Sequence, residues 1–204
     1  DLIGFDAKQM GGKKILIKPN LLTNAAPEKA VITHPVFFHA VVQLVKAFGG
    51  IPILGENPAT KPLSKVIGSV GYREIVDAEN IRVADMQETD VLVADGPLKF
   101  KRFEISKIFF EADMISNLPK LKTHSLTLLT GAVKNVFGAI PGLNKSQWYV
   151  KAPSSEEFSE FLLDLNECLF TGFKPPKKFL HIMDAVVGME GEGPGPSGSP
   201  RFIG

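Results

Sequence analysis

Short runs of apolar residues recur along the chain, and longer amphipathic segments separate them. Pro19 and Pro119 end two of these runs, and Gly55 breaks a third. Because proline and glycine interrupt strands, short apolar runs that end in this way are typical of buried strands. We predict core strands at 13–22, 51–57, 81–86, 112–118 and 178–188.

A helical period marks the segment that follows the first strand. Thr33 or His34 can cap a helix with Pro35 in its first turn, and Gly49 and Gly50 end it. The apolar stripe of this helix consists of Phe37, Phe38, Val41, Leu44, Val45 and Phe48. Their spacing predicts an amphipathic helix that packs one face against a sheet.

A second helix begins at the capping box of Ser154 and Glu157. Its stripe consists of Phe158, Phe161, Leu162, Leu165, Cys168 and Leu169. Residues 61–79 have a weaker helical period, which glycines interrupt, and they predict a broken helix. Residues 130–140 also have helical spacing.

Strands that alternate with helices predict an α/β fold with a mainly parallel sheet and helices on both faces. Residues 91–105 differ, because Asp95-Gly96 lies between two strand-like runs and indicates a β-hairpin inserted at the sheet edge. The Gly- and Pro-rich end, 188–204, is typical of a loop. We expect one α/β domain over 1–204, and the start at Asp1 favours a piece of a longer chain.

Charge and composition exclude some classes of protein. The 23 Lys and Arg residues nearly balance the 22 Asp and Glu residues, so we predict no nucleic-acid partner. The longest apolar runs are far shorter than the roughly 20 residues of a membrane span, and no span is predicted. Cys168 is the single cysteine. One thiol forms no internal disulfide and cannot supply the roughly four ligands of an iron–sulfur cluster, so we expect a cytoplasmic chain that itself holds no cluster.

Polar residues follow the predicted strands at the end where open α/β sheets bind their ligands. They are Lys18, Asn20, Glu56, Asn57, Asn117, Lys120 and Asp184. The carboxylates of Glu56 and Asp184 could hold Mg²⁺ or another hard cation. No spacing of histidine and cysteine indicates zinc.

The segment 117–142 combines an apolar helical face with many donors. Gly131, Asn135 and Gly138 fall on the opposite face of the predicted helix, with Lys134 at its flank. Glycine inside a helix costs about 0.5–1 kcal/mol relative to alanine, so two on one face indicate that a ligand or another helix approaches closely.

Lys120, Lys122 and His124 precede that helix, where its free N–H groups would favour an anion. The same alternation also fits an exposed strand with solvated lysines. Because an α/β sheet would bring these residues near Lys18 and Asn20, we predict a site for a phosphate or carboxylate group.

The histidines have different expected roles. His34 either caps its helix or acts as a general acid or base, and His124 is the other candidate for proton transfer. His39 is expected at the surface and His181 inside the last strand.

Four stretches, IKPNLL, THP, ILGENPA and NLPKLKTHSLTLLTGAVKNVFGAIPG, resemble the prokaryotic family catalogued as domain of unknown function 362, over 13–194. The resemblance implies no reaction. Members often carry ferredoxin-like iron–sulfur modules, which implies such a module as a partner. The matching motif residues here are Lys18, Asn20, Thr33, His34, Glu56, Lys120, Lys122, His124, Lys134 and Asn135.

Three functions remain open from the sequence. In the first, the domain binds or acts on an anionic small molecule that the lysines hold, the asparagines orient and a histidine protonates. In the second, it is a redox accessory domain for a ferredoxin-like module. The third is a scaffold, which would follow if the lysines and His124 pointed apart.

Overall fold

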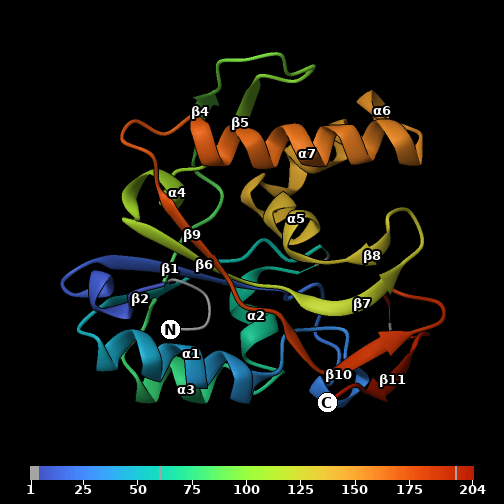
Figure 1. The fold of residues 1–204 in the computed structure, drawn as a ribbon. Coiled ribbons are helices and arrows are strands. Elements are labelled where there is room, and N and C mark those ends of the chain that lie inside the picture. Colours follow the sequence, from blue (N-terminus) through green and yellow to red (C-terminus); the bar gives the residue numbers. More distant parts are fainter. Residues whose placement is uncertain (1–4, 60, 196) are drawn as a thin grey trace.

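A five-stranded parallel sheet lies at the centre of the computed structural model, which describes residues 5–59, 61–195 and 197–204 (Figure 1). Its strand order is β3-β2-β1-β6-β9. The bounds are Lys14–Pro19 for β1, Ile51–Leu54 for β2, Arg82–Val83 for β3, Met114–Leu118 for β6 and Lys178–His181 for β9. Each neighbouring pair is parallel, so the predicted α/β class is confirmed.

Helices cover both faces of this sheet (Figure 1). One hydrophobic core lies under α1 (Pro35–Ala47), α2 (Leu63–Ile67) and α3 (Arg73–Ala78). The other lies under α4 (Ile108–Glu111), α5 (Ala132–Asn135), α6 (Gly142–Lys151) and α7 (Ser155–Thr171). Short 3₁₀ turns occupy Ala7–Met10, Pro27–Lys29 and Val136–Ala139, the last of which is labelled η3.

Helix α1 begins as predicted, because His34 Nδ1 accepts a hydrogen bond of 3.3 Å from the Val36 N–H. Its buried face consists of Phe38, Val41, Val42 and Val45. Two members of the predicted stripe, Leu44 and Phe48, are exposed instead. The predicted stripe is therefore rotated about the helix axis relative to the buried face, which Phe38, Val42 and Val45 define.

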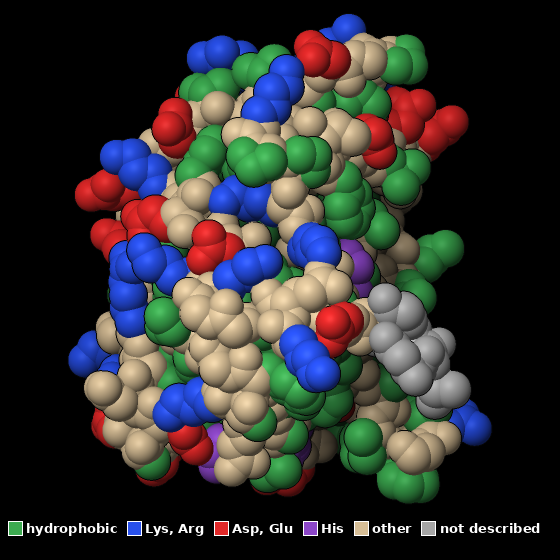
Figure 2. All heavy atoms as spheres, turned by 60° about the vertical axis from the view of Figure 1, so that its left-hand side comes forward, with side chains coloured by type: hydrophobic (Ala, Val, Ile, Leu, Met, Phe, Trp, Pro, Cys, Tyr) green, Lys and Arg blue, Asp and Glu red, His purple; other side chains and the backbone are tan. Residues whose placement is uncertain are grey.

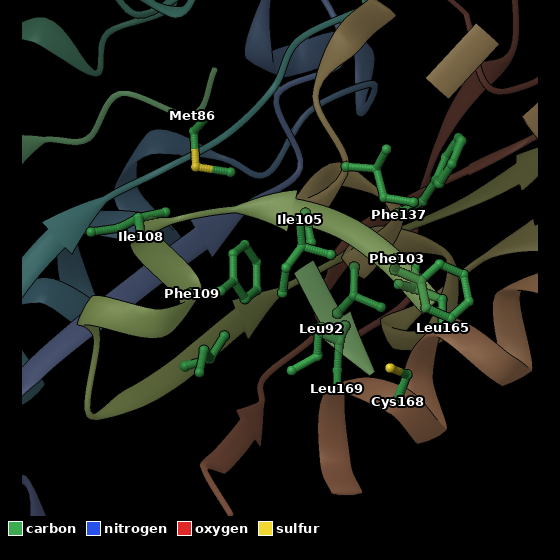
Figure 3. Packing of buried hydrophobic residues seen from close by; sticks show 14 of the residues in the cluster. Met86, Leu92, Phe103, Ile105, Ile108, Phe109, Phe137, Leu165, Cys168 and Leu169 are labelled. Carbon is green, nitrogen blue, oxygen red and sulfur yellow. The ribbon is translucent and has the colours of Figure 1, made fainter. Parts of the chain in front are cut away.

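The predicted hairpin forms β4 (Thr89–Val93) and β5 (Arg102–Ser106), which pair antiparallel. It is a separate two-stranded sheet rather than an addition to the edge of the central sheet. Leu92 and Phe103 face the interior, where they share a cluster with Leu165 and Leu169 of α7 (Figure 3). Packing on α7 therefore replaces pairing with the parallel strands.

Cys168 lies inside the same cluster (Figure 3) and is fully buried. Burial raises the pKa of its thiol to about 11. A thiol in this setting behaves as a small apolar group, which agrees with its place on the predicted stripe.

A second sheet extends from the carboxyl ends of β6 and β9. Its order is β11-β10-β7-β8, with bounds Ser199–Phe202 for β11, Asp184–Glu190 for β10, Lys120–His124 for β7 and Leu128–Thr130 for β8. The predicted strand 178–188 is thus two strands in different sheets. Pro119 cannot donate to a ladder, so β6 ends there and the chain turns into β7, while Asp184 N donates to Pro119 O at 2.9 Å and starts β10 beside it.

Two further expectations are corrected. The end at 188–204, predicted as a loop, includes the last residues of β10 and the strand β11, which pair antiparallel. The predicted helix 130–140 is a four-residue α5 followed by the 3₁₀ turn η3. A helix this short carries little macrodipole, so the expected attraction of an anion to its N-terminus does not apply. Helix α6 was not predicted because its apolar period is weak.

Candidate functional site

The order of strands reverses between β1 and β6. Strands β2 and β3 lie to one side of β1, whereas β6 and β9 lie to the other. In open α/β sheets the crevice beyond the carboxyl ends at such a point is the usual ligand site. A cavity of about 110 Å³ lies there in this protein, and its lining includes Asn20, Glu56, Asn57, Lys122, His124, Thr130, Lys134, Asn135, Gly138, Lys145 and Tyr149.

Most of the site residues expected from the sequence line this one cavity. Asn20, Glu56, Lys122, His124, Lys134 and Asn135 belong to its wall. Lys18 lies outside the lining and contacts two of its members, Glu56 and Gly138. Lys120, Asp184 and His34 form a cluster that is also outside the lining. Lys145 and Thr130 line the cavity and were not expected.

Two fully buried lysines are each paired with a carboxylate. Lys18 Nζ lies 2.8 Å from Glu56 Oε2, and Lys120 Nζ lies 2.8 Å from Asp184 Oδ2. The second pair also anchors α1, because the His34 N–H donates to Asp184 Oδ2 at 2.8 Å. These two lysines therefore have internal counter-ions, and His34 serves as a capping residue.

Gly138 explains part of the glycine pattern in the segment 117–142. A Cβ at this position would lie 2.5 Å from both Lys18 Nζ and Glu56 Oε1. At Gly131 a Cβ would meet only Met183 Cε, at an ordinary 3.6 Å. The close approach predicted from the two glycines is thus made at Gly138 alone, by the Lys18–Glu56 ion pair.

A relay of three asparagine amides leads to the cavity, which two of them, Asn20 and Asn135, line. Asn117 Nδ2 donates to Ala132 O at 3.1 Å, and Asn117 Oδ1 accepts from Asn135 Nδ2 at 2.7 Å. Asn135 Oδ1 in turn accepts from Asn20 Nδ2 at 2.8 Å. Because a backbone carbonyl can only accept, Ala132 O fixes the orientation of every amide in the relay.

The relay ends at Lys122, to which it presents an acceptor. Lys122 Nζ donates to Asn20 Oδ1 at 2.9 Å and to Val31 O at 2.5 Å. Its side chain is 1% exposed, and within the described residues no carboxylate pairs with it. Burial and repulsion from Lys134 lower the pKa of Lys122 to about 7.

Two half-buried lysines complete the cationic side of the cavity. Lys134 Nζ lies 5.0 Å from the centre of the Phe137 ring, and Lys145 Nζ donates to Asn57 O at 2.8 Å. Burial is the main cause that lowers the pKa of each to about 8, and repulsion from Lys18 adds to it. In the part of the chain that the structure describes, neither has a carboxylate within 4 Å.

Lys120 and Lys122 differ from one of the alternatives predicted for this segment. The alternation of lysine and leucine in β7 also fitted an exposed strand with its lysines in solvent. Instead both lysines are buried and Leu121 between them is partly exposed. Only tertiary partners, Asp184 for one lysine and the asparagine relay for the other, could reveal this inversion.

His124 and Thr130 add hydrogen-bonding groups to the wall. His124 Nδ1 accepts from the Leu126 N–H at 3.1 Å, and burial lowers the pKa of the imidazole to about 4. At neutral pH the ring is therefore uncharged and carries its proton on Nε2. Thr130 is 2% exposed, and its Oγ1 has no hydrogen-bond partner among the described residues.

The other histidines stay away from the cavity wall. His39 lies 2.7 Å from Glu79 Oε1 at the surface, as expected. His181 was expected inside its strand, but it is exposed at the end of β9, where Asn117 Nδ2 donates to its Nδ1 at 3.0 Å.

The two carboxylates considered for Mg²⁺ are both occupied by lysine ammonium groups. Among the residues that the structure describes, no group of three or more His, Cys, Asp or Glu side chains is placed to hold a metal ion. The cavity wall instead offers amines, amides, a neutral imidazole and a hydroxyl, beside the Glu56 carboxylate that is paired with Lys18. Such a set recognises negative charge and polar oxygen atoms.

One face of the molecule mixes both signs of charge. Figure 2 shows Lys and Arg side chains in several separate places on one face, with Asp and Glu among them. Within the described ranges, none of the helices is long and apolar enough to cross a membrane.

Comparison with known proteins identifies relatives of the chain. A family model described as "Domain of unknown function (DUF362)" matches residues 15–204. A thylakoid-associated protein of the cyanobacterium Synechocystis sp. is 34% identical over 194 residues, which are 95% of this chain and 57% of that protein. The chain thus spans a little over half the length of this relative.

Proposed function

The chain belongs to the family of domain of unknown function 362, and we propose that it binds a small anionic molecule in the cavity beyond β1 and β6. The ligand bears a phosphate or carboxylate group. One observation carries this proposal: Lys122, Lys134 and Lys145 line the cavity without a carboxylate partner in the described residues, whereas Lys18 and Lys120 each have one.

Electrostatics supports an anionic ligand. A buried cation without a counter-ion is costly, and it either loses its proton or gains a negative partner. The lowered pKa values of Lys122, Lys134 and Lys145 reflect that cost. An anion in the cavity would offset this cost and favour the charged form of the amines that bind it.

The size of the cavity limits what fits inside. At about 110 Å³ it is smaller than the roughly 150 Å³ cavity that admits benzene, and smaller than the roughly 300–1,000 Å³ of drug-sized pockets. A compact anionic group therefore fits within it. A larger ligand would leave the rest of its structure outside.

The other polar residues supply orientation and proton chemistry in this proposal. Asn20 and Asn135 hold Lys122 in place, and the Nε2–H of His124 and the hydroxyl of Thr130 donate to ligand oxygens. His124 is the proposed site of proton transfer, because His34 already serves as a helix cap. The anion binds to lysines rather than to Mg²⁺.

The cytoplasm is the proposed compartment, since the single buried thiol suits a reducing environment. The association with thylakoids belongs to the printed name of the Synechocystis protein.

Thermal unfolding with inorganic phosphate and with malonate tests the proposal. At a ligand concentration of about 100 times Kd, the parent Tm should rise by roughly 5–10 °C. Lys134→Met or Lys145→Met should weaken binding by roughly 10–150-fold, because each removes a charge-assisted contact worth about 1.5–3 kcal/mol.

Lys65→Met is the matched control, since Lys65 is an exposed lysine of α2 outside the cavity. This variant should keep the parent response. Equal stabilisation of all variants would remove the cavity from the binding site, and no response to either anion would contradict the proposal.

A further inference from the structure

Lys122 differs from the other lysines of the site in the combination of its hydrogen-bond partners. Its Nζ donates two hydrogen bonds, both to neutral oxygens, Asn20 Oδ1 and Val31 O. A neutral amine has two N–H groups and one lone pair. With both hydrogens engaged on the protein side, the lone pair is the part of Nζ left for a ligand in the cavity that Lys122 lines.

The asparagine relay keeps one of these acceptors, Asn20 Oδ1, in place. Ala132 O orients Asn117, Asn117 orients Asn135, and Asn135 orients Asn20, so Asn20 can offer only its oxygen to Lys122. Because one backbone carbonyl fixes the direction of the whole relay, the relay holds a single amine, that of Lys122, in position. Lys18 and Lys120 have carboxylate partners instead.

A second observation points into the same space. Thr130 lies directly opposite Lys122 in the pairing of β7 with β8, and its buried hydroxyl has no partner among the described residues. Buried hydroxyls are normally hydrogen-bonded, so a ligand oxygen next to Lys122 Nζ would satisfy this one.

We propose that Lys122 forms an imine with the carbonyl carbon of a small oxo acid whose carboxylate Lys134 and Lys145 hold. This inference rests on the proposed function and narrows its ligand to a carbonyl-bearing anion. Lys134, above an aromatic ring, and Lys145 remain the cations that bind the carboxylate.

The step needs no oxidant or reductant. The lone pair of Lys122 Nζ forms the C–N bond while the C=O π pair moves to oxygen, which gains a proton and gives a carbinolamine. That hydroxyl takes a second proton and leaves as water while the C=N bond forms. One proton comes from Nζ and one from solvent, so the protonated imine keeps one N–H for Asn20 Oδ1. Thr130 and His124 are placed on the wall to donate to the carbonyl oxygen.

Reductive trapping tests the inference on the intact chain. Pyruvate and 2-oxoglutarate are the probes, cyanoborohydride reduces any imine to a stable secondary amine, and peptide mass spectrometry locates the adduct. At pH 7 about half of an amine with a pKa of about 7 is unprotonated, against about one part in three thousand at the ordinary 10.5. We expect labelling of Lys122 to exceed that of any other lysine by at least about tenfold.

Lys177 is the internal comparison, because burial also lowers the pKa of this lysine although it lies outside the cavity. Lys122→Arg keeps the positive charge and its donors but cannot form an imine, so it should lose the adduct. Labelling spread over Lys177 and surface lysines, or no adduct at Lys122 with either probe, overturns the inference.

Thermal shifts separate this failure from failure of the proposed function. If the oxo acids stabilise the parent more than Lys134→Met but leave no adduct, imine formation is wrong and anion binding stands. If neither the oxo acids nor phosphate stabilises the parent, both proposals are wrong.

Discussion

Two groups of lysines lie near the carboxyl ends of the same parallel strands, and they differ in what compensates their charge. Lys18 and Lys120 are each 2.8 Å from a carboxylate oxygen. Lys122, Lys134 and Lys145 have neutral acceptors or aromatic rings instead. The first group holds the fold together, and the second surrounds a cavity.

The difference teaches how one local composition serves two purposes. The two charges of an ion pair within the chain already compensate each other, so a ligand is not needed and the pair suits a structural role. A buried amine without a counter-ion is stabilised in its charged form when an anion binds next to it. Function is therefore expected where the pairing is incomplete, and the following changes test that division.

Asp184→Asn should have the largest effect on stability. Asparagine can still accept from the His34 N–H, but Lys120 would remain buried without its counter-ion. Breaking a buried pair in this way costs about 3–5 kcal/mol in the free energy of unfolding, which urea denaturation measures. As a control, Glu88→Gln removes the exposed partner of Lys107 and should leave stability nearly unchanged. Equal losses of unfolding free energy in the two variants would contradict the structural role of the Lys120–Asp184 pair.

Gly138→Ala should cost less, about 1–3 kcal/mol, because its Cβ would press on the Lys18–Glu56 pair and force it to shift. Gly131→Ala is the control on the same segment, since its Cβ meets only Met183 Cε at 3.6 Å. We expect this second change to cost less than about 1 kcal/mol. Equal losses of unfolding free energy would show that the ion pair does not require glycine at 138.

A smaller effect is expected in the pH dependence of stability, to which the cavity lysines should contribute. Their pKa values of about 7 to 8 in the folded state lie below the unfolded value of 10.5. Between these limits the unfolded chain binds more protons, so the free energy of unfolding should rise with pH from about 7 toward 10. Lys134→Met should flatten this rise and Lys65→Met should not. Identical pH profiles of the two variants would contradict the lowered pKa of Lys134.

His124 should also make the free energy of unfolding rise with pH, but in the acid range. Its folded pKa of about 4 lies below the ordinary 6.5, so the unfolded chain again binds more protons between these values. Stability from the neutral imidazole should be present above about pH 6.5 and decline as the pH falls toward 4.

Local signals made much of the fold predictable. The capping box at Ser154, the cap at His34 and the proline that ends β1 depend on neighbours within a few residues, and all three are present. The rule on strand ends then indicated Asn20, Glu56 and Asn57 of the cavity lining, and the donor-rich segment 117–142 indicated Lys122 and Asn135. These features need no knowledge of tertiary contacts.

The remaining features depend on partners distant in sequence. Lys122 faces inward because Asn20 and Val31 accept hydrogen bonds from it. Asn20 is 102 positions away in the sequence and Val31 is 91 positions away. The break between β9 and β10 follows from the pairing of Asp184 with Lys120. Lys145 lies in α6, whose weak apolar period gave no sign that its lysine reaches the cavity.

Calorimetry of sulfate binding tests the central claim most directly, because sulfate has no titratable proton near neutral pH. In buffers of different ionisation enthalpy at pH 8, binding should be accompanied by net proton uptake, since the anion raises the lowered pKa values of the cavity lysines. The uptake should diminish at pH 6 and in Lys134→Met. Sulfate that does not bind, or that binds at pH 8 without taking up protons, would contradict the account.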